Sequence, residues 1–592
     1  MNESVFNRML AEVQKPARYT GGELGAVYKD PDKVDIRFAF CFPDLYEIGM
    51  SSQATQILYD VLNKDESIWC ERFFAPWFDM REQMEKENAE LFSLESRTPL
   101  SEFDVIGFTL QYEMSYTNVL YMLELGKVKL FSRERGENDP FVVGGGPCTC
   151  NPEPMAEFFD MFSLGDGEET DNEICHCIAE CRRRGLDRRQ TLEACAGIEG
   201  VYVPSLYEPE YLPDGRLSGY RALEGAPALP VRKRIFMDMD EAPYPLNPIV
   251  PSMAVIHNRP SVEVLRGCIR GCRFCQAGFI YRPFRCKDAS LICTQAKALI
   301  DNTGYDEISL LSLSTSDHPQ LEEIMDGLVD WSIEKKVNLS LPSLRVDSFT
   351  GTLAQKLRQV RESGLTFAAE AGTQRLRNVI NKNITEEEIL SGCEDAFMNG
   401  YTAVKLYFML GLPTETDEDV LAISALCQKI VDLFYSLPSR PKGKSVTVSA
   451  SVSCFIPKPK TPFEFCGFNG VEELRRKQQM LVGSVRSRKI DISYHDSETS
   501  YIETVLAKGD RRVHKAILAA YRNGSIFDGW SEGFDDGSWL KAFEDTGIDA
   551  DFYALRARDT DEFEPWDVVD YGVSKSFLKR EYEKAVAAQT TP

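Results

Sequence analysis

Residues 262–283 read VEVLRGCIRGCRFCQAGFIYRP, and the three cysteines of this stretch decide how the rest of the chain is interpreted. Cys268, Cys272 and Cys275 are separated by three and then two residues and follow a predicted strand at 261–266. Three thiolates on one short loop can each bind one iron of a [4Fe–4S] cluster, which leaves the fourth iron open to a chelating ligand. A zinc site would need a fourth Cys or His, for which Cys286 is the nearest candidate. The spacing therefore predicts an iron–sulfur cluster.

The strand before the cysteines begins a series of strand-like runs, each followed by a segment of helical character. These runs are 261–266, 306–313, 337–342, 365–370, 402–409 and 446–456. Six β/α units predict an α/β core over residues 251–489, with the form of a (β/α)6 partial TIM barrel. Chemistry in such sheets collects at the carboxyl ends of the strands.

The sequence before this core predicts a second α/β domain. Short apolar runs at 34–40, 104–110 and 141–143 read as buried parallel strands, which indicates a Rossmann or flavodoxin-like domain over residues 1–200. Residues 201–250 are rich in proline and read as a structured linker. Residues 490–592 are interpreted as a small, mostly helical carboxyl-terminal cap.

Bulk properties restrict the function further. The net charge of −25 over 592 residues makes indiscriminate binding of nucleic acid unfavourable, although local basic segments leave nucleic acid open as a partner. The amino-terminal residues lack the pattern of a signal peptide, and no apolar run is long enough to span a membrane, so we expect a cytoplasmic protein without a membrane partner. Five dispersed histidines give no support to hydrolase chemistry.

The cysteine motif closely resembles that of the radical S-adenosylmethionine (SAM) superfamily, and nearly the whole chain resembles the cobalamin-binding-domain radical SAM proteins of unassigned function. That resemblance implies reduction of SAM by the cluster and release of a 5′-deoxyadenosyl radical. It also implies an electron donor such as flavodoxin or ferredoxin, and a separate companion polypeptide. The segments that carry it are FPDLYEIGMSS, ERFFAPW, GFTLQYE, GGGPCTCNPEP, the cysteine loop, EAGTQRLRNVINKN, KLYFMLGLPTET, IPKPKTPF and GDRRVHK.

Four positions lie where the superfamily keeps its contacts to SAM. Phe274 would pack near the adenine, and Ser314, with its neighbours Ser312 and Ser316, would meet the ammonium group. Glu370 ends an apolar strand, where a carboxylate is costly unless it is paired or bonded to a ligand such as the ribose. Gly411 would let the backbone pass the adenine. A core aromatic and an ordinary polar strand exit remain alternatives for the first two positions. Candidates for binding the SAM carboxylate are Arg345, Arg377 and Lys405.

The loop FPDLYEIGMSS resembles the cobalamin-binding pattern D-x-H-x-x-G, formed here by Asp44, Tyr46 and Gly49. Tyrosine replaces the histidine that would ligate cobalt, and it is a poor cobalt ligand. The glycine run Gly144, Gly145 and Gly146 follows a strand and would allow close approach of a large planar cofactor. We therefore expect cobalamin to bind without histidine ligation. A Rossmann-like domain that holds no cofactor is the alternative.

The leading functional hypothesis is a radical SAM enzyme, cobalamin-dependent, that methylates an unreactive carbon of an unidentified substrate. A methylthiotransferase acting on RNA or a ribosomal component is the second, because residues 456–463 (IPKPKTPF) resemble that class. Such an enzyme needs a second cluster, and the cysteines 41, 70, 148 and 150 lack convincing spacing for it. The group at 175–181 is interpreted as buried thiols. A third hypothesis is a non-catalytic iron–sulfur binding or sensing module.

Overall fold

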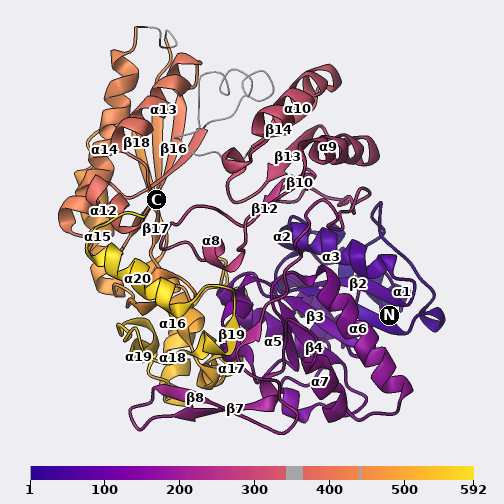
Figure 1. The fold of residues 1–592 in the computed structure, drawn as a ribbon. Coiled ribbons are helices and arrows are strands. Elements are labelled where there is room, and N and C mark those ends of the chain that lie inside the picture. Colours follow the sequence, from indigo (N-terminus) through magenta and orange to yellow (C-terminus); the bar gives the residue numbers. More distant parts are fainter. Residues whose placement is uncertain (1, 342–364, 439, 441–442, 592) are drawn as a thin grey trace. The chain divides into compact units, whose positions relative to one another are not determined.

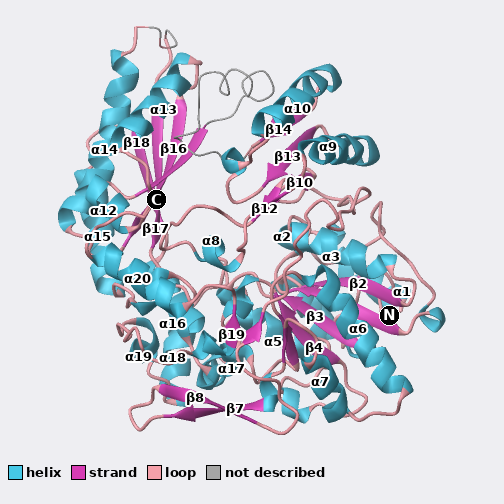
Figure 2. Cartoon of the chain, in the orientation of Figure 1, coloured by secondary structure: helices cyan, strands magenta, loops and turns pink. Residues whose placement is uncertain are grey.

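The computed structural model describes residues 2–341, 365–438, 440 and 443–591. The chain divides into two compact units, and both mix helices with strands (Figures 1 and 2). Unit 1 comprises Met1–Asn258, Leu506–Ala550 and Phe563–Gly572, and unit 2 comprises Arg259–Val505, Asp551–Glu562 and Val573–Pro592. None of the helices in these described ranges combines the length and apolar character needed to cross a membrane.

Unit 1 is built on a six-stranded sheet in the order β2-β1-β3-β4-β5-β6. The first five strands are parallel, and β6 is antiparallel to β5. The order 2-1-3-4-5 is that of a flavodoxin-like doubly wound sheet, as predicted, with its strand order reversing between β1 and β3. The strands are β1 (Ile36–Phe42), β2 (Ile68–Phe74), β3 (Val105–Thr109), β4 (Phe141–Gly145), β5 (Met161–Ser163) and β6 (Val201–Tyr202).

Helices surround this sheet, and the strands are almost wholly buried, as expected of a parallel sheet covered on both faces. The helices before the linker are α1 (Glu3–Ala11), α2 (Tyr46–Gly49), α3 (Gln53–Lys64), α4 (Phe78–Glu87), α5 (Tyr116–Leu125), α6 (Gly167–Arg183) and α7 (Arg188–Ala196). The remaining elements of unit 1 are β7 (Tyr207–Tyr211), β8 (Leu217–Ala222), β9 (Val231–Arg232), α17 (His514–Arg522), α18 (Asp536–Thr546) and β19 (Val569–Asp570).

Unit 2 contains two parallel sheets, in the orders β10-β13-β14 and β15-β16-β17-β18. The strands are β10 (Ser261–Glu263), β13 (Glu307–Leu311), β14 (Asn338–Ser340), β15 (Leu365–Glu370), β16 (Ala403–Leu410), β17 (Thr447–Cys454) and β18 (Ile490–Tyr494), with the short antiparallel pair β11 (Leu265–Arg266) and β12 (Arg285–Cys286). The helices are α8 (Gln276–Ile280), α9 (Ala289–Thr303), α10 (Leu321–Lys335), α12 (Gln374–Val379), α13 (Glu386–Met398), α14 (Asp417–Ser436), α15 (Val471–Ser484) and α20 (Lys575–Val586); α16 (Ser497–Lys508) and α19 (Ala550–Ala554) cross the boundaries between the units.

The six predicted strands of the core are all present, but they do not form one continuous sheet among the described residues. The residues that follow β14, 342–364, lie outside the described ranges, so closure into a partial barrel stays a prediction. The sequence analysis did not predict β18, which extends the second sheet past the predicted limit of the core at residue 489.

The tail from 490 to 592 is not the separate helical cap that the sequence predicted. Its segments 506–550 and 563–572 belong to unit 1, and the rest belongs to unit 2. The linker at 201–250 also holds more structure than expected, since β7 and β8 form an antiparallel hairpin and β9 pairs with β19 of the tail. Strand pairing between distant segments, which local composition does not reveal, accounts for these differences.

Candidate functional site

The cysteine loop of unit 2 is closed at its base by the antiparallel pair β11 and β12. Gly267 has a φ of +84°, and an added Cβ would lie 2.6 Å from the Pro283 carbonyl oxygen, so glycine is needed where the loop begins. Cys275 is the residue before α8. Cys286 lies opposite Leu265 in the pair, at the base of the loop rather than among the other three cysteines.

The three predicted ligands are all half-buried. Burial, and then the neighbouring thiols of Cys272 and Cys268, raise the pKa of Cys275 to about 12, which indicates that the three sulfurs face a common region. Within the described ranges, no three Cys, His, Asp or Glu side chains are gathered closely enough to enclose a single metal ion. A cubane cluster differs from a single ion because each thiolate binds a different iron atom. The donor set fits such a cluster.

A buried arginine fixes the cysteine loop from one side. The guanidinium of Arg273 has no exposed surface; it pairs with Glu581 of α20 at 3.1 Å and donates to the Val379 carbonyl at 2.9 Å. The backbone N–H of Arg273 donates to the Ile380 carbonyl at 2.9 Å, and the Asn381 amide donates to the Gly271 carbonyl at 3.1 Å. Charge-assisted hydrogen bonds of this kind in a dry environment hold the loop in one conformation.

A second ion pair ties the loop to the end of β13. Arg270 Nε donates to Asp317 Oδ2 at 2.9 Å, and Asp317 lies in the turn that contains Ser314 and Ser316. The hydroxyl oxygens of both serines are buried and have no hydrogen-bond partner among the residues that the structure describes. A buried hydroxyl without a partner is costly, so these two groups are suited to a polar ligand beside the cluster. The SAM contact at Ser314 stays a prediction, and its buried hydroxyl is compatible with it.

Glu370 ends β15 in a left-handed conformation, with a φ of +65°. Its Oε1 pairs with Lys382 Nζ at 3.1 Å, and the side chain of Lys382 is buried. The positive charge of Lys382 also acts on the thiol of Cys275, so this pair lies beside the cysteine loop. The carboxylate thus has a partner within the protein, and its burial does not require the predicted ribose hydroxyl. A non-glycine residue at positive φ stores strain, which is common at functional sites.

The remaining adenine contacts meet in one apolar cluster. Phe274 packs on a group of buried residues that includes Ala371, directly after Glu370, and Leu412, directly after Gly411. Gly411 has a φ of +85°, and its N–H donates to Glu415 Oε1 at 2.9 Å. Segments that are about 140 residues apart in the sequence therefore converge around the cysteine loop, as the sequence predicted.

The three candidates for binding the SAM carboxylate have different surroundings. Arg377 is fully buried and donates to the carbonyl oxygens of Ala371 at 2.9 Å and Gly372 at 3.3 Å, so its guanidinium holds the turn after β15. Lys405 is exposed on β16, with its ammonium 5.0 Å from the ring centre of Tyr407. Arg345 lies outside the described residues.

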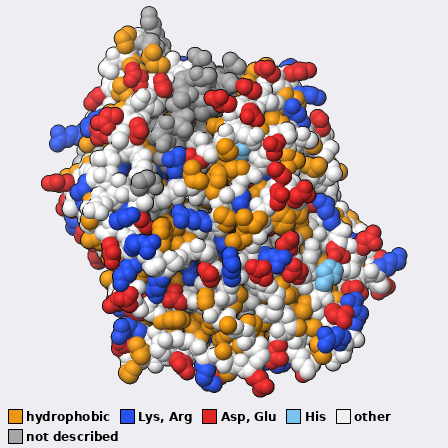
Figure 3. Space-filling model, viewed as in Figure 1, with side chains coloured by type: hydrophobic (Ala, Val, Ile, Leu, Met, Phe, Trp, Pro, Cys, Tyr) orange, Lys and Arg blue, Asp and Glu red, His pale blue; other side chains and the backbone are white. Residues whose placement is uncertain are grey.

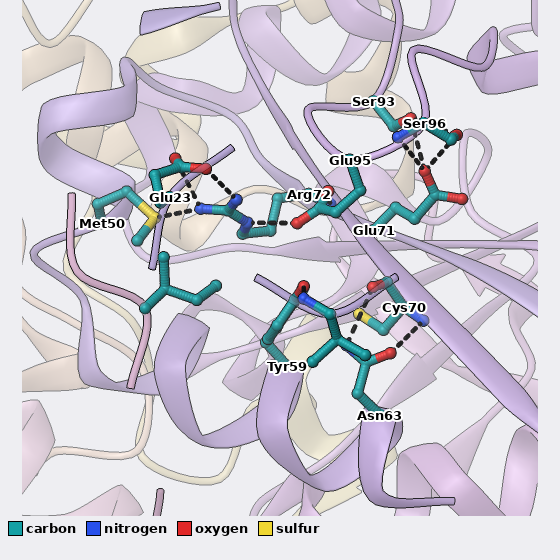
Figure 4. A network of polar contacts seen from close by, with 12 residues as sticks. Glu23, Met50, Tyr59, Asn63, Cys70, Glu71, Arg72, Ser93, Glu95 and Ser96 are labelled. Carbon is teal, nitrogen blue, oxygen red and sulfur yellow. Dashed lines mark hydrogen bonds and ion pairs between the residues drawn. The ribbon is translucent and has the colours of Figure 1, made fainter. Parts of the chain in front are cut away.

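In unit 1, the predicted cobalamin motif is used for packing. Tyr46 is buried, and its hydroxyl donates to Glu23 Oε1 at 2.9 Å. Figure 4 shows how Glu23 and Glu95 flank the guanidinium of Arg72, with ion-pair distances of 2.8 and 2.7 Å. An added Cβ at Gly49 would lie 2.2 Å from the Phe74 ring. Tyr46 and Gly49 therefore have no surface open to a cofactor.

The third residue of the motif and the glycine run have similar roles. Asp44 is half-buried, and its Oδ1 accepts a hydrogen bond from Trp530 Nε1 at 2.9 Å. An added Cβ at Gly144 would lie 2.7 Å from the Phe162 ring, and Gly146 has a φ of +98° close to the Leu110 carbonyl. Gly145 is the member of the run with open space beside it. These residues do not form an open cradle, and cobalamin stays a prediction.

The sequence analysis interpreted the cysteines at 175–181 on α6 as buried thiols, and it did not foresee their contact with Cys195 of α7. Cys177 lies one helical turn before Cys181, and Cys195 of α7 is fully buried. A hydrogen bond with Cys195, aided by Cys181 and the charge of Arg184, lowers the pKa of Cys177 to about 7 despite its partial burial. The spacing of four residues between Cys177 and Cys181 is the signal that could have found the pair.

Comparison with known proteins agrees with this geometry. Residues 262–427 match the model of the radical SAM superfamily, and residues 54–204 match the model of the amino-terminal region of radical SAM proteins. The chain therefore contains a radical SAM domain together with that amino-terminal region, and it is an enzyme. Enzymes of this class use a [4Fe–4S] cluster and SAM, so the prediction of an enzyme with these two cofactors is confirmed.

The relatives differ in how much of the chain they share. An uncharacterized protein of Methanocaldococcus jannaschii is 27% identical over 520 residues, which are 86% of this chain and 97% of the relative. The threonylcarbamoyladenosine tRNA methylthiotransferase MtaB of Treponema pallidum is 21% identical over 180 residues, 30% of this chain and 37% of that protein. The solved radical SAM methyltransferase TsrM of Kitasatospora setae, with cobalamin and a [4Fe–4S] cluster bound, is 14% identical with a TM-score of 0.44, covering 70% of this chain and 74% of that one. A likeness this slight carries no conclusion about cobalamin here.

Proposed function

We propose that the chain cleaves SAM at a [4Fe–4S] cluster held by Cys268, Cys272 and Cys275, and that it uses the resulting radical to modify an unreactive carbon of its substrate. When bound, the cluster supplies one electron to SAM, whose C–S bond breaks into methionine and a 5′-deoxyadenosyl radical. The observation that carries the proposal is the convergence of the half-buried thiols with the unpartnered serine hydroxyls.

The residues around the loop have separate tasks. Arg273 and Arg270 fix the loop, so that the three sulfurs keep their spacing when the cluster binds. Ser314 and Ser316 would bond the polar groups of the SAM methionine, and Phe274 with Leu412 would exclude water from the adenine side. The electron has to come from a partner, for which a protein of the flavodoxin or ferredoxin type is suitable.

The open face of the second sheet is where we place the substrate. Strand β16 has paired neighbours on both sides, yet Lys405 and Tyr407 are exposed on it, whereas the alternate residues are buried. The neighbouring strand β17 places Ser449 and Ser451 beside them in register. A polar, accessible face on a central strand is unusual for a parallel sheet, because such sheets are normally covered on both faces. It would suit a polar substrate, with Lys405 opposite an anionic group.

Two more specific reactions, methylation through cobalamin and methylthio transfer, have less support. Methylation through cobalamin lacks support from the residues, because the motif at Asp44, Tyr46 and Gly49 is used for packing. Methylthio transfer would need a second cluster, and the amino-terminal cysteines 41, 70, 148 and 150 lack convincing spacing for it. The matched methylthiotransferase also shares only 180 residues with this chain, which are 37% of its own length. A radical modification of unassigned type is therefore the proposal that we retain.

The test compares single substitutions of the cysteines after anaerobic reconstitution. Cys272→Ala should lower the iron content and abolish the formation of 5′-deoxyadenosine from SAM under a strong reductant. Cys286→Ala is the matched control, since it lies in the base of the same loop, and it should keep both. Full iron content and SAM cleavage in Cys272→Ala would show that this thiol is no ligand and would contradict the assignment.

A further inference from the structure

The carboxyl edge of the sheet in unit 1 is where a fold of this type binds ligands. In doubly wound sheets the ligand lies outside the carboxyl ends of the strands, at the point where the strand order reverses. That point lies between β1 and β3. The segments that border it are 43–45 after β1, 75–78 after β2 and 110–118 after β3, of which the last two include the first residues of α4 and α5, and we call them the switch-point loops.

A segment of the tail, residues 525–534, contacts all three switch-point loops; we call it the docked segment. It follows α17, which packs against α5 (Figure 1). Trp530 Nε1 donates to Asp44 Oδ1 at 2.9 Å. The N–H of Phe527 donates to Asn118 Oδ1 at 2.6 Å, while Asn118 Nδ2 donates to the Pro43 carbonyl at 2.9 Å. One amide side chain thus joins the first and third loops to the docked segment.

Aromatic contacts fix the docked segment on the second loop. Phe527 has no exposed surface, and its ring centre lies 4.9 Å from Trp77 and 5.6 Å from Phe78. Trp530 meets the same Trp77 ring edge-on at 6.0 Å. Aromatic pairs at these distances add to the free energy that burial of the rings already supplies. Exposed loop tips rarely have aromatic side chains packed in this way, so the docked segment is held at a defined position on these loops.

The loop after β4 is covered by other parts of the tail. Asn151 Nδ2 donates to the carbonyl oxygens of Ala507 and Gly509, both at 2.9 Å. The hydroxyls of Thr149 and Tyr571 lie 2.9 Å apart. The tail therefore closes the carboxyl edge from β2 to β4.

We propose that the docked segment is the resident ligand of this edge: an aromatic peptide of the same chain occupies the place where a flavodoxin-like sheet holds a cofactor. The Asp44 carboxylate accepts a hydrogen bond from the indole N–H of Trp530, and the Asn118 side-chain amide accepts one from the backbone N–H of Phe527. The ring of Phe527 packs on the rings of Trp77 and Phe78. This goes beyond the proposed function in unit 2 and is independent of it. It implies that unit 1 binds no cobalamin at this edge while the segment is docked.

The test measures amide hydrogen exchange in the full chain and the retention of hydroxocobalamin on gel filtration. In the natural sequence, the amides of residues 526–530 should exchange slowly, and no cobalamin should be retained. Trp530→Phe removes the bond to Asp44 but keeps an aromatic ring, and it should accelerate exchange of the docked segment about fivefold to tenfold, as expected for the loss of one hydrogen bond. Trp530→Ala should accelerate it further.

Glu532→Gln is the matched control, because this side chain is exposed in the same segment and should leave exchange unchanged. Retention of cobalamin by Trp530→Ala and not by the natural sequence would support the proposal. Stoichiometric cobalamin on the natural sequence with residues 526–530 still protected would overturn it, as would exchange of the natural segment at the rate of an unfolded peptide. Neither outcome bears on SAM cleavage in unit 2.

Discussion

Cys177 lies outside the cysteine loop, and its surroundings lower the pKa of its thiol. Because the pKa of Cys177 is lowered to about 7 by its contact with Cys195, about half of this thiol should be ionised at neutral pH, whereas an ordinary thiol with a pKa of about 8.5 is almost wholly protonated there. We expect the rate of its alkylation by iodoacetamide, followed by mass spectrometry of its peptide, to rise through a midpoint near pH 7.

The comparison that isolates this effect is substitution of its partner. Cys195→Ala removes the hydrogen bond to the Cys177 thiolate and should move the alkylation midpoint upward, while Cys41, which is buried in the sheet of the same unit, should stay unreactive in both proteins. A midpoint of about 8.5 or higher in the natural sequence would show that Cys177 is not perturbed.

At the level of single residues, the spacing of the cysteine loop can be read from the sequence, whereas the packing around the cobalamin motif cannot. Spacing within one loop is a local property, so Cys268, Cys272 and Cys275 can be read directly. The role of Tyr46 depends on Glu23 and Arg72, which come from other segments and pair only in the folded chain. A motif match alone could not reveal that its side chain is enclosed.

Among the elements, the strands were predictable wherever apolar and polar residues alternate along them or their residues are apolar throughout. Strand β2 was missed because IWCERFF carries Glu71 and Arg72 at its centre, which is unusual for a buried strand. Both charges are paired in the structure, Glu71 with Arg37 and Arg72 with two glutamates. Buried ion pairs of this kind cannot be recognised from one strand alone, since their partners are remote.

The docked segment should be less stable at higher pH because of Asp528. Burial raises the pKa of its carboxyl to about 7, although the hydrogen bond that Thr117 donates to it at 2.8 Å acts to lower the pKa. The neighbouring charge of Asp535 raises it further. Between about pH 4 and pH 7 the unfolded carboxyl is ionised while the folded one keeps its proton, so the folded state binds more protons and its stability falls as pH rises.

Substitution Asp528→Asn tests this expectation. The amide keeps the shape and cannot ionise, so the loss of stability of a few kcal/mol between pH 4 and pH 7 that we attribute to this group should disappear. Urea unfolding at several pH values, compared between the two proteins, measures the difference. Parallel pH profiles for both proteins would contradict the assigned pKa of Asp528.

For the molecule as a whole, the sequence predicted two α/β units but not how the tail is shared between them. Residues 506–550 and 563–572 join unit 1 through contacts such as Arg511 with Glu153, which are 358 residues apart. Hydrophobic periodicity reports only which face of an element is buried, not which distant segment covers it. The surface matches the bulk composition: acidic and basic side chains are interspersed on the face shown in Figure 3.

The most direct test of the central claim is whether SAM binds the open iron of a cluster in this chain. The protein is reconstituted without oxygen and reduced, and electron–nuclear double resonance is recorded with SAM labelled with ¹⁷O in its carboxylate or ¹⁵N in its amino group. Hyperfine coupling between the reduced cluster and the label is the predicted result, because three cysteines leave one iron open. A reduced cluster whose spectrum shows no coupling to either label would contradict the account.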